Sequence, residues 1–206
     1  IIVFSRKGRR KYMKLVLASH NKHKAEEIKN ILGDGFEVIT QSEAGFSGEV
    51  TEDGETFEEN AAKKAETVMK ALGVPVIADD SGLCVKALGG APGVHTARYA
   101  GEGATDEENI KKLLEAMKDV PDGERDAEFK CTIALSVPGE ETKLFSGSCR
   151  GSILREKSGC DGFGYDPVFF TPVFKKSLAS VSQSEKNSIS HRGGALRKFK
   201  AYMCGE

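Results

Sequence analysis

The amino-acid sequence predicts a mixed α/β fold, in which helices flank a sheet with both parallel and antiparallel strands. Near the start of the chain, short apolar runs alternate with amphipathic segments, which is typical of strand–helix–strand units. Residues 127–137 and 142–154 alternate apolar and polar side chains on either side of Pro138-Gly139. This pattern predicts a long antiparallel hairpin, which makes the expected sheet mixed.

The composition bounds the class of protein. The 206 residues suffice for one domain with a substantial core or for two small lobes, and a net charge of −1 argues against a general nucleic-acid-binding protein. No apolar run approaches the roughly 20 residues of a membrane span, so no membrane partner is expected. The 5 cysteines are odd in number, widely spaced and without a C-x-x-C pair. They favour reduced thiols and a cytoplasmic location over disulfides or a zinc site.

Residues 1–12 form a short basic segment in front of Met13. Its apolar part is too short for a secretory signal, and it lacks a cleavage site. One interpretation is an arm that binds nucleic acid; the one we favour is an N-terminal extension that is not part of the fold. Residues 13–206 contain no repeat, linker or low-complexity tract, and we expect them to form a single domain.

The segment Lys14–Ala18 predicts the first strand, and a helix with apolar residues at helical spacing follows it. Between them, Ser19 and Asn21 are candidate N-caps, and Lys24 lies one turn into the helix. Unpaired N–H groups at a helix start, a small polar side chain and a lysine together make a phosphate site in physical terms. Ordinary capping explains the same pattern, and no G-x-x-x-x-G-K-[ST] motif is present.

A second strand is predicted at Phe36–Thr40, and an acidic loop leads from it to the best-defined helix, Thr56–Leu72. Thr56 is expected to cap this helix, and Glu59 completes a capping box. Lys64 lies on a face of the helix from which it can reach a ligand at the edge of the sheet. Simple solvation of its charge is the ordinary alternative.

The apolar run Val76–Ala78 predicts a short buried strand that ends in the turn formers Asp79, Asp80 and Ser81-Gly82. Ligand crevices in open α/β sheets lie at such strand ends. Because neighbours along a strand point to opposite faces, we expect the two carboxylates to differ in role, one facing a cleft and the other capping the turn. An acidic surface turn without function is the alternative.

Glycine-rich segments at 87–101 and 159–167 predict loops of the kind that often carry function. Glycines on both sides of Phe163 suggest a close approach of the backbone and an exposed aromatic face. Between the two loops, Thr105 and Glu108 form a capping box that opens a structural helix.

The C-terminal segment predicts an amphipathic helix with apolar residues at Leu196, Phe199 and Met203. Hydrogen-bond donors are expected to cluster just before or at its start, where the positive end of the helix adds to them. These donors are Lys186, His191 and Arg192.

Taken together, the chain closely resembles the inosine triphosphate pyrophosphatase family. The matching stretches are LVLASHNKHKAEEI, TFEENAAKKA, ADDSGLCVKALGGAPGVHTARYAG, GFGYDP and SHRGGAL, in the order and spacing of the family and covering residues 13–203. One departure is Ser19-His20-Asn21, which stands where many members have Thr-Gly-Asn. His20 puts the stiffness of this loop in doubt.

The resemblance implies an elongated α/β fold whose two lobes enclose a central active-site cleft, and a homodimer. It also implies Mg²⁺-dependent hydrolysis of ITP, dITP and XTP to the monophosphate and pyrophosphate. Such an enzyme removes deaminated purines from the nucleotide pool.

The resemblance assigns roles by position. Asp80 matches the residue that serves Mg²⁺ and water activation, and Glu52 matches the second metal carboxylate. The implied phosphate-binding residues are Ser19, Asn21, Lys24, Lys64 and Ser81. The implied nucleoside-binding residues are Phe163, Gly164, Tyr165, Asp166, Lys186, His191 and Arg192.

Physical chemistry agrees with these roles. Mg²⁺ keeps several waters, so two carboxylates and phosphate oxygens suffice to hold it, and Lys24 and Lys64 neutralise further phosphate charge. Catalysis by positioning and charge needs no covalent nucleophile, and we expect none. Lysine and arginine are donors only, so Lys186 and Arg192 favour the 6-oxo group of hypoxanthine or xanthine over the amino group of adenine. Phe163 can stack on the base.

Two other functions stay open at this point. A different pyrophosphatase would act on standard or modified pyrimidine nucleotides. A nucleotide sensor or nucleic-acid-binding module would use residues 1–12 and the basic stretch Arg197–Lys200. Against the module, the carboxylates at Glu52, Asp79 and Asp80 would repel a phosphate backbone in the absence of a metal ion.

Overall fold

The structure is a computed structural model that describes residues 4–7 and 10–205. The chain divides into two compact units. Unit 1 comprises the described residues of Ile1–Asp80, Cys131–Gly147 and Arg192–Glu206, and unit 2 comprises Ser81–Lys130 and Ser148–His191.

The strands of unit 1 form a mixed sheet. Strand β1 (Phe4–Lys7) pairs antiparallel with β2 (Arg10–Ala18), whereas β3 (Phe36–Thr40) and β4 (Val76–Val85) pair parallel with β2. Next to β4 in the sheet come β5 and then β6. The expected mixed α/β class is therefore confirmed.

Strands β5 (Asp126–Ser136) and β6 (Lys143–Ile153) are the two arms of the predicted hairpin, and like β4 they contribute residues to both units. In unit 2, β6 pairs antiparallel with β7 (Phe169–Thr171), which pairs antiparallel with β8 (Lys176–Ser177).

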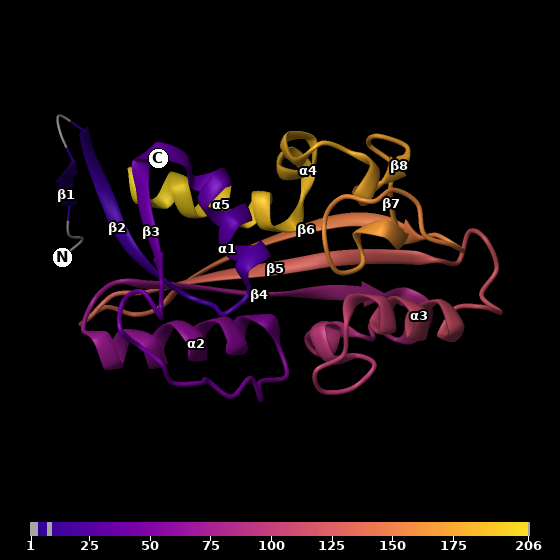
Figure 1. Ribbon diagram of the computed structural model, residues 1–206, viewed down its shortest axis with the longest axis horizontal. Helices are drawn as coiled ribbons and strands as arrows, with labels where there is room; N and C mark the ends of the chain where they lie inside the picture. The colour runs from indigo at the N-terminus through magenta and orange to yellow at the C-terminus, as the bar shows by residue number, and fades with distance from the viewer. Residues whose placement is uncertain (1–3, 8–9, 206) are drawn as a thin grey trace. The chain divides into compact units, whose positions relative to one another are not determined.

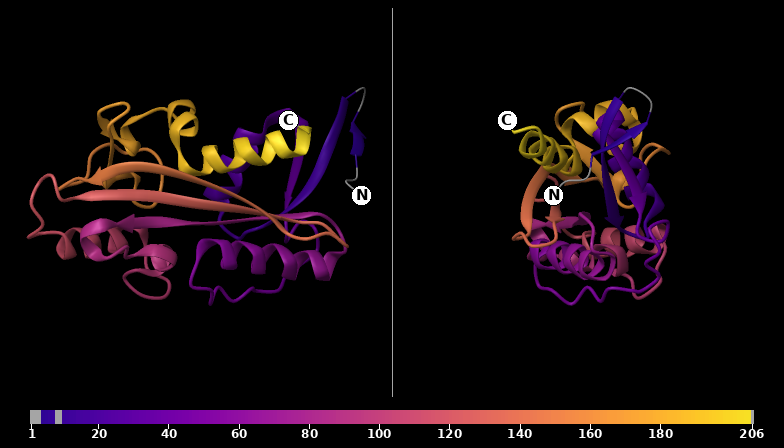
Figure 2. Two further views of the ribbon diagram at one scale, coloured as in Figure 1. Left: turned by 180° about the vertical axis from the view of Figure 1, so that it is seen from behind. Right: turned by 90° about the vertical axis from the view of Figure 1, so that its left-hand side faces the viewer.

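Helices cover both faces of the unit 1 strands. Helix α1 (Lys22–Leu32) and α5 (His191–Cys204) lie on one face, and α2 (Phe57–Leu72) lies on the other (Figures 1 and 2). Local sequence sets their ends as predicted: Asn21 caps α1, and the capping box of Thr56 and Glu59 opens α2.

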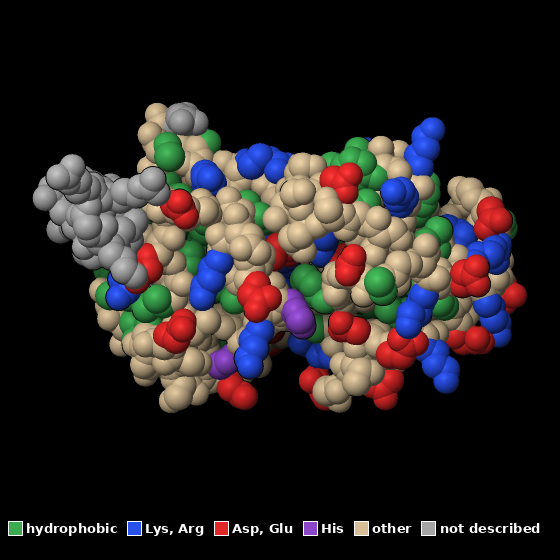
Figure 3. All heavy atoms as spheres, turned by 45° about the horizontal axis from the view of Figure 1, so that its top comes forward, with side chains coloured by type: hydrophobic (Ala, Val, Ile, Leu, Met, Phe, Trp, Pro, Cys, Tyr) green, Lys and Arg blue, Asp and Glu red, His purple; other side chains and the backbone are tan. Residues whose placement is uncertain are grey.

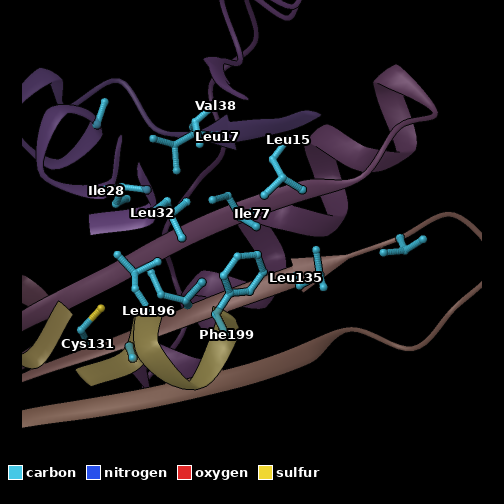
Figure 4. Packing of buried hydrophobic residues seen from close by; sticks show 14 residues of the cluster. Leu15, Leu17, Ile28, Leu32, Val38, Ile77, Cys131, Leu135, Leu196 and Phe199 are labelled. Atoms are coloured by element: carbon cyan, nitrogen blue, oxygen red, sulfur yellow. The ribbon is translucent and has the colours of Figure 1, made fainter. Parts of the chain in front are cut away.

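The alternation of side chains along β4 decides what each face of unit 1 buries. Ile77 packs with residues of α1, α5 and β5 in one apolar cluster, which Figure 4 shows. Val76 and Ala78 point the other way and pack against α2. By the same alternation, Asp79 continues the α1 and α5 face, and Asp80 continues the α2 face.

Unit 2 has its own core. Helix α3 (Asp106–Ala116) begins at the predicted capping box of Thr105 and Glu108 and packs its apolar side chains against those of β4, β5 and β6. The short helix α4 (Gln183–Ile189) leads to the start of α5. No helix in the described ranges is long and apolar enough to cross a membrane.

Some predicted boundaries were wrong. Strand β4 does not end at Asp79 but runs through Asp80, Ser81 and Gly82 to Val85. It continues because the two buried carboxylates find cationic partners on the faces of the sheet, so they need not leave it for water. Helix α4 was not predicted because its one buried residue is Lys186, which leaves no apolar period to detect.

The strand expected at residues 14–18 and the C-terminal helix also start earlier in the chain than expected. Strand β2 begins at Arg10, and β1 pairs with it within the segment that was expected to lie outside the fold. That expectation falls partly on residues 1–3 and 8–9, which lie outside the described residues. Helix α5 begins at His191, so that Gly193 and Gly194 are inside it.

Candidate active site

Two adjacent carboxylates in the middle of β4, Asp79 and Asp80, are both almost fully buried. Burial of an ionised carboxylate is unfavourable unless cations and hydrogen-bond donors compensate its charge. The partners of the two side chains therefore show how each face of β4 is built.

Asp79 has a complete set of donors. Arg192 donates from Nε to Oδ2 at 2.8 Å and from Nη2 to Oδ1 at 3.3 Å, and Lys24 Nζ lies 2.7 Å from Oδ1. The buried Cys131 thiol donates to Oδ2 at 3.1 Å. Burial alone would raise the pKa of Asp79, but the charges of Arg192 and Lys24 outweigh it and hold the pKa well below its usual range. Asp79 is therefore a fixed negative charge.

Arg192 also binds a second buried carboxylate. Its Nη1 donates to Glu27 on α1, and the two side chains are 1% and 3% exposed. Burial disfavours a charged guanidinium, but Asp79 and Glu27 more than offset it, so the pKa of Arg192 is raised. Together, Glu27, Asp79, Lys24 and Arg192 form a charge-balanced network that joins α1, β4 and α5.

Asp80 is only partly compensated. Lys64 Nζ donates to Asp80 Oδ1 at 2.9 Å and to the main-chain oxygen of Asp79 at 2.8 Å, and it lies 3.2 Å from Glu52 Oε1. The other carboxylate oxygen of Asp80, Oδ2, is buried and has no hydrogen-bond partner within the described part of the chain. Burial raises the pKa of Asp80 to about 6, although Lys64 opposes the shift.

Glu52 completes this cluster from the acidic loop before α2. Burial raises its pKa, but the charge of Lys64 outweighs burial, so that the pKa of Glu52 is lowered. Lys64 itself is costly to bury, yet Asp80 and Glu52 raise its pKa and keep it charged. Lys64 therefore lies between two carboxylates and contacts both.

The Asp80 and Glu52 pair fits a hard divalent cation. Among residues 4–7 and 10–205, no group of three or more His, Cys, Asp or Glu side chains is arranged to hold a metal ion. Mg²⁺ does not need such a cage, because it commonly binds through one or two carboxylates, waters and substrate phosphate. The unpartnered Oδ2 of Asp80 is the kind of buried oxygen that a cation would satisfy.

The start of α1 shows what its polar residues do in the structure. The Ser19 hydroxyl accepts a hydrogen bond from the Asn21 amide at 3.1 Å, and Asn21 Oδ1 accepts from the Lys24 amide at 3.0 Å. Both oxygens thus serve the helix cap. Lys24, which extends to Asp79, is the member of this group that joins the buried network. Phosphate binding by Ser19, Asn21 and Lys24 stays a prediction.

Unit 2 brings together four of the predicted nucleoside-binding residues. Lys186 Nζ lies 2.6 Å from Asp166 Oδ2 and 4.6 Å from the centre of the Phe163 ring. Asp166 Oδ2 also accepts from the Phe163 amide at 3.0 Å. Gly162 must lack a side chain, because a Cβ there would lie 2.3 Å from Asp166 Oδ2. The next amide, that of Gly164, donates to Asp106 on α3.

Tyr165 and His191, the other predicted nucleoside-binding residues of unit 2, have other partners in the structure. The Tyr165 hydroxyl donates to the main-chain oxygen of Thr96 at 3.1 Å. The His191 ring stacks on Phe129 with a centroid distance of 4.8 Å. Ser81 is half-buried and directly follows Asp80 in β4. Substrate contacts of these residues stay predictions.

Sequence reasoning did not single out Glu27, Cys131 or Asp106 as functional. Glu27 could have been found from the helical pattern, because it lies next to Ile28 on the buried face of α1, where a charged residue needs a partner. No local pattern points to Cys131 or Asp106, because their partners are 52 and 58 residues away in the chain.

The chain is similar to known proteins over most of its length. The model of the Ham1 family matches residues 15–202. A dITP/XTP pyrophosphatase of Bacillus subtilis (strain 168) is 49% identical over 189 residues, which cover 91% of this chain and 96% of that protein.

Two solved structures of Ham1 proteins are also similar to this chain over most of its length. The Staphylococcus aureus Ham1 protein aligns with a TM-score of 0.85 at 46% identity, covering 93% of this chain and 98% of the other. A HAM1 protein from Coxiella burnetii aligns with a TM-score of 0.85 at 42% identity, covering 94% and 99%.

Proposed function

This chain belongs to the Ham1 family, and we propose that it is a Mg²⁺-dependent pyrophosphatase of deaminated purine nucleoside triphosphates. ITP, dITP and XTP would be converted to the monophosphate and pyrophosphate. The similarity to dITP/XTP pyrophosphatases over nine tenths of the chain supports the substrate class. The observation that carries the chemistry is the pair of buried Asp80 and partly exposed Glu52, bridged by Lys64, with one carboxylate oxygen of Asp80 left without a partner among the described residues.

The phosphate chemistry is assigned to unit 1. Asp80 and Glu52 would hold Mg²⁺, which when bound neutralises phosphate charge and favours attack by water. Asp80 would also accept a proton from that water. Lys64 keeps both carboxylates oriented, and Lys24 would donate to phosphate oxygens together with Ser19, Asn21 and Ser81.

Recognition of the base is assigned to the residues around Phe163. Its ring would stack on the purine, supported on one side by the ammonium group of Lys186. Lys186 and Arg192 offer only donors, which favours a 6-oxo purine over adenine. Gly164, Tyr165, Asp166 and His191 are assigned to the same nucleoside site. Acidic and basic side chains are interspersed on the face shown in Figure 3, which does not favour a nucleic-acid partner.

The direct test is phosphorus NMR of the products from ITP, XTP, ATP, GTP and dTTP in ¹⁸O-labelled water, with Mg²⁺ and with EDTA. We expect pyrophosphate from ITP and XTP alone, only with Mg²⁺, and with the label in the monophosphate. Release of orthophosphate, or label in pyrophosphate, would contradict attack at the α-phosphorus. Equal rates on ATP or dTTP would contradict the base assignment.

Two further properties implied by the family resemblance belong to the proposal. We expect a homodimer, which light scattering coupled to size exclusion would detect as twice the chain mass of 22.2 kDa. We also expect the enzyme to work in the cytoplasm, where the nucleotide pool is found. A monomeric mass under assay conditions would contradict the dimer and leave the chemistry unaffected.

A further inference from the structure

The loop that carries Phe163 is held by two carboxylates on consecutive amides. The Phe163 amide donates to Asp166 Oδ2 at 3.0 Å, and the Gly164 amide donates to Asp106 Oδ2 at 2.7 Å. Asp166 belongs to the loop itself. Asp106 is the first residue of α3, a separate and well-packed element of the same unit.

The first turn of α3 contacts this segment at a second point. Glu107 Oε2 lies 2.6 Å from Nζ of Lys157, which precedes the glycine-rich stretch. Adjacent residues of one helix thus hold the segment at two points, one through the main chain and one through a side chain. The contact to the main chain is the one that constrains the position of Phe163.

The loop needs such a constraint because of its glycines. Gly162 and Gly164 both have positive φ, +80° and +60°, which glycine adopts readily but leaves just as readily. A charge-assisted hydrogen bond from the Gly164 amide to a rigid helix removes part of this freedom. Lys186 contacts the ring of Phe163, whereas Asp106 holds the backbone at Gly164.

We propose that Asp106 is a positioning residue for Phe163: it fixes the backbone at Gly164, so that the ring is already in place when a purine base arrives. The proposal rests on the proposed function for the assignment of Phe163 to the base. Its physical content is preorganisation, because a loop that is ordered before binding does not have to be ordered by the ligand.

A fluorescence experiment tests the positioning without any nucleotide. The sequence contains no tryptophan, so Phe163→Trp introduces a single indole that reports on this loop alone. In that background, Asp106→Ala is expected to lower the steady-state anisotropy of the indole. Asp106→Asn, which keeps an acceptor oxygen, is expected to restore it. Unchanged anisotropy in the Asp106→Ala protein would overturn the proposal.

Glu107→Gln is the matched control. It removes a negative charge from the same first turn of α3 and weakens the contact to Lys157, but it leaves the Gly164 amide bonded to Asp106. We expect its anisotropy to equal that of the parent protein. An equal fall in Glu107→Gln and Asp106→Ala would assign the effect to the charge of the helix start and overturn the role of Asp106.

Kinetics on the natural Phe163 background test the consequence for binding. Asp106→Ala is expected to raise KM for ITP about fivefold, which corresponds to the net effect of one hydrogen bond, while kcat changes less than about twofold. In a Phe163→Ala background, the same substitution should add nothing to KM. An unchanged KM in Asp106→Ala, or an equally large effect without the ring, would overturn the proposal.

The two readouts separate this inference from the proposed function. If Phe163→Ala leaves KM for ITP unchanged, the base assignment falls, and with it the role of Asp106 in binding. The anisotropy difference between Asp106→Ala and Asp106→Asn would then describe loop order alone.

Discussion

Asp79 and Asp80 are the same residue type, adjacent in one strand and almost equally buried, yet their partners differ and their pKa values shift in opposite directions. Asp79 is surrounded by Arg192, Lys24 and a thiol donor, and its pKa is held well below the usual range. Asp80 has one lysine and a carboxylate neighbour, and burial raises its pKa to about 6.

The difference shows how one strand can carry a structural and a chemical carboxylate side by side. Alternation along β4 directs Asp79 to α1 and α5, where its charge is fully compensated. The same alternation directs Asp80 to α2, where one oxygen is left for a ligand. The face with complete partners contributes stability, and the face with incomplete partners is where binding energy is available.

The largest effect is expected when Asp80 is neutralised. Asp80→Asn keeps the shape of the side chain but removes the metal ligand and proton acceptor, so we expect ITP hydrolysis to fall about 10⁴-fold. The melting temperature should stay within a few degrees of the parent protein, because Asp80 is not fully compensated in the fold. Pyrophosphate release and thermal unfolding measure the two effects. Substantial turnover by this variant would contradict the assigned chemistry.

Asp79→Asn is expected to act mainly on stability. It leaves Arg192 and Lys24 with Glu27 as their remaining carboxylate in the network, and breaking such a buried pair typically costs about 3–5 kcal/mol. Urea unfolding followed by circular dichroism gives the free energy of unfolding. A loss of less than about 1 kcal/mol would show that the network is not what compensates this side chain.

Glu27→Gln sharpens the comparison at the second carboxylate that Arg192 binds. It removes one of the two carboxylates on Arg192 but leaves Asp79 in place, so we expect a smaller loss of about 2 kcal/mol. If the network acts as a unit, the double variant with Asp79→Asn should lose less than the sum of the single losses. Simple additivity would argue for independent contacts.

The smallest effect concerns pH, and its sign differs between the two carboxylates. A raised folded pKa means that the folded protein takes up protons as the pH falls through about 6, so Asp80 adds roughly 1–2 kcal/mol of stability between pH 7 and pH 5. Asp80→Asn should remove this gain in metal-free protein. The pKa of Asp79 is lowered in the folded protein, so its contribution to stability is complete above its unfolded pKa of about 4 and is lost only at lower pH. Asp79 therefore adds no pH dependence of stability between pH 7 and pH 5.

Features of the fold that depend on residues close together in the sequence were predicted, and features that depend on residues far apart in the sequence were not. The helix starts at Asn21, Thr56 and Thr105 were predicted, because a cap is decided by residues within one turn. The continuation of β4 through residues 79–82 was not, because cations from distant parts of the chain bind the two carboxylates there despite the local turn residues.

The candidate site follows the same rule. Asp80, Glu52 and Lys64 were proposed from the sequence, and the structure brings them together. Arg192 was expected to face a base, whereas the structure shows its guanidinium on Asp79 and Glu27; a contact with the base stays a prediction. Such long-range pairing of buried charges leaves no periodic trace in the sequence.

The most direct test of the division between the two carboxylates is metal binding, measured with Mn²⁺ as a paramagnetic substitute for Mg²⁺. Electron paramagnetic resonance of free Mn²⁺ would be recorded with the parent protein, Asp79→Asn and Asp80→Asn, at a temperature where each is folded. We predict that Asp80→Asn weakens binding at least about tenfold, and that Asp79→Asn changes it less than about threefold. Equal weakening by both substitutions would contradict the account, because the two faces of β4 would then form one site.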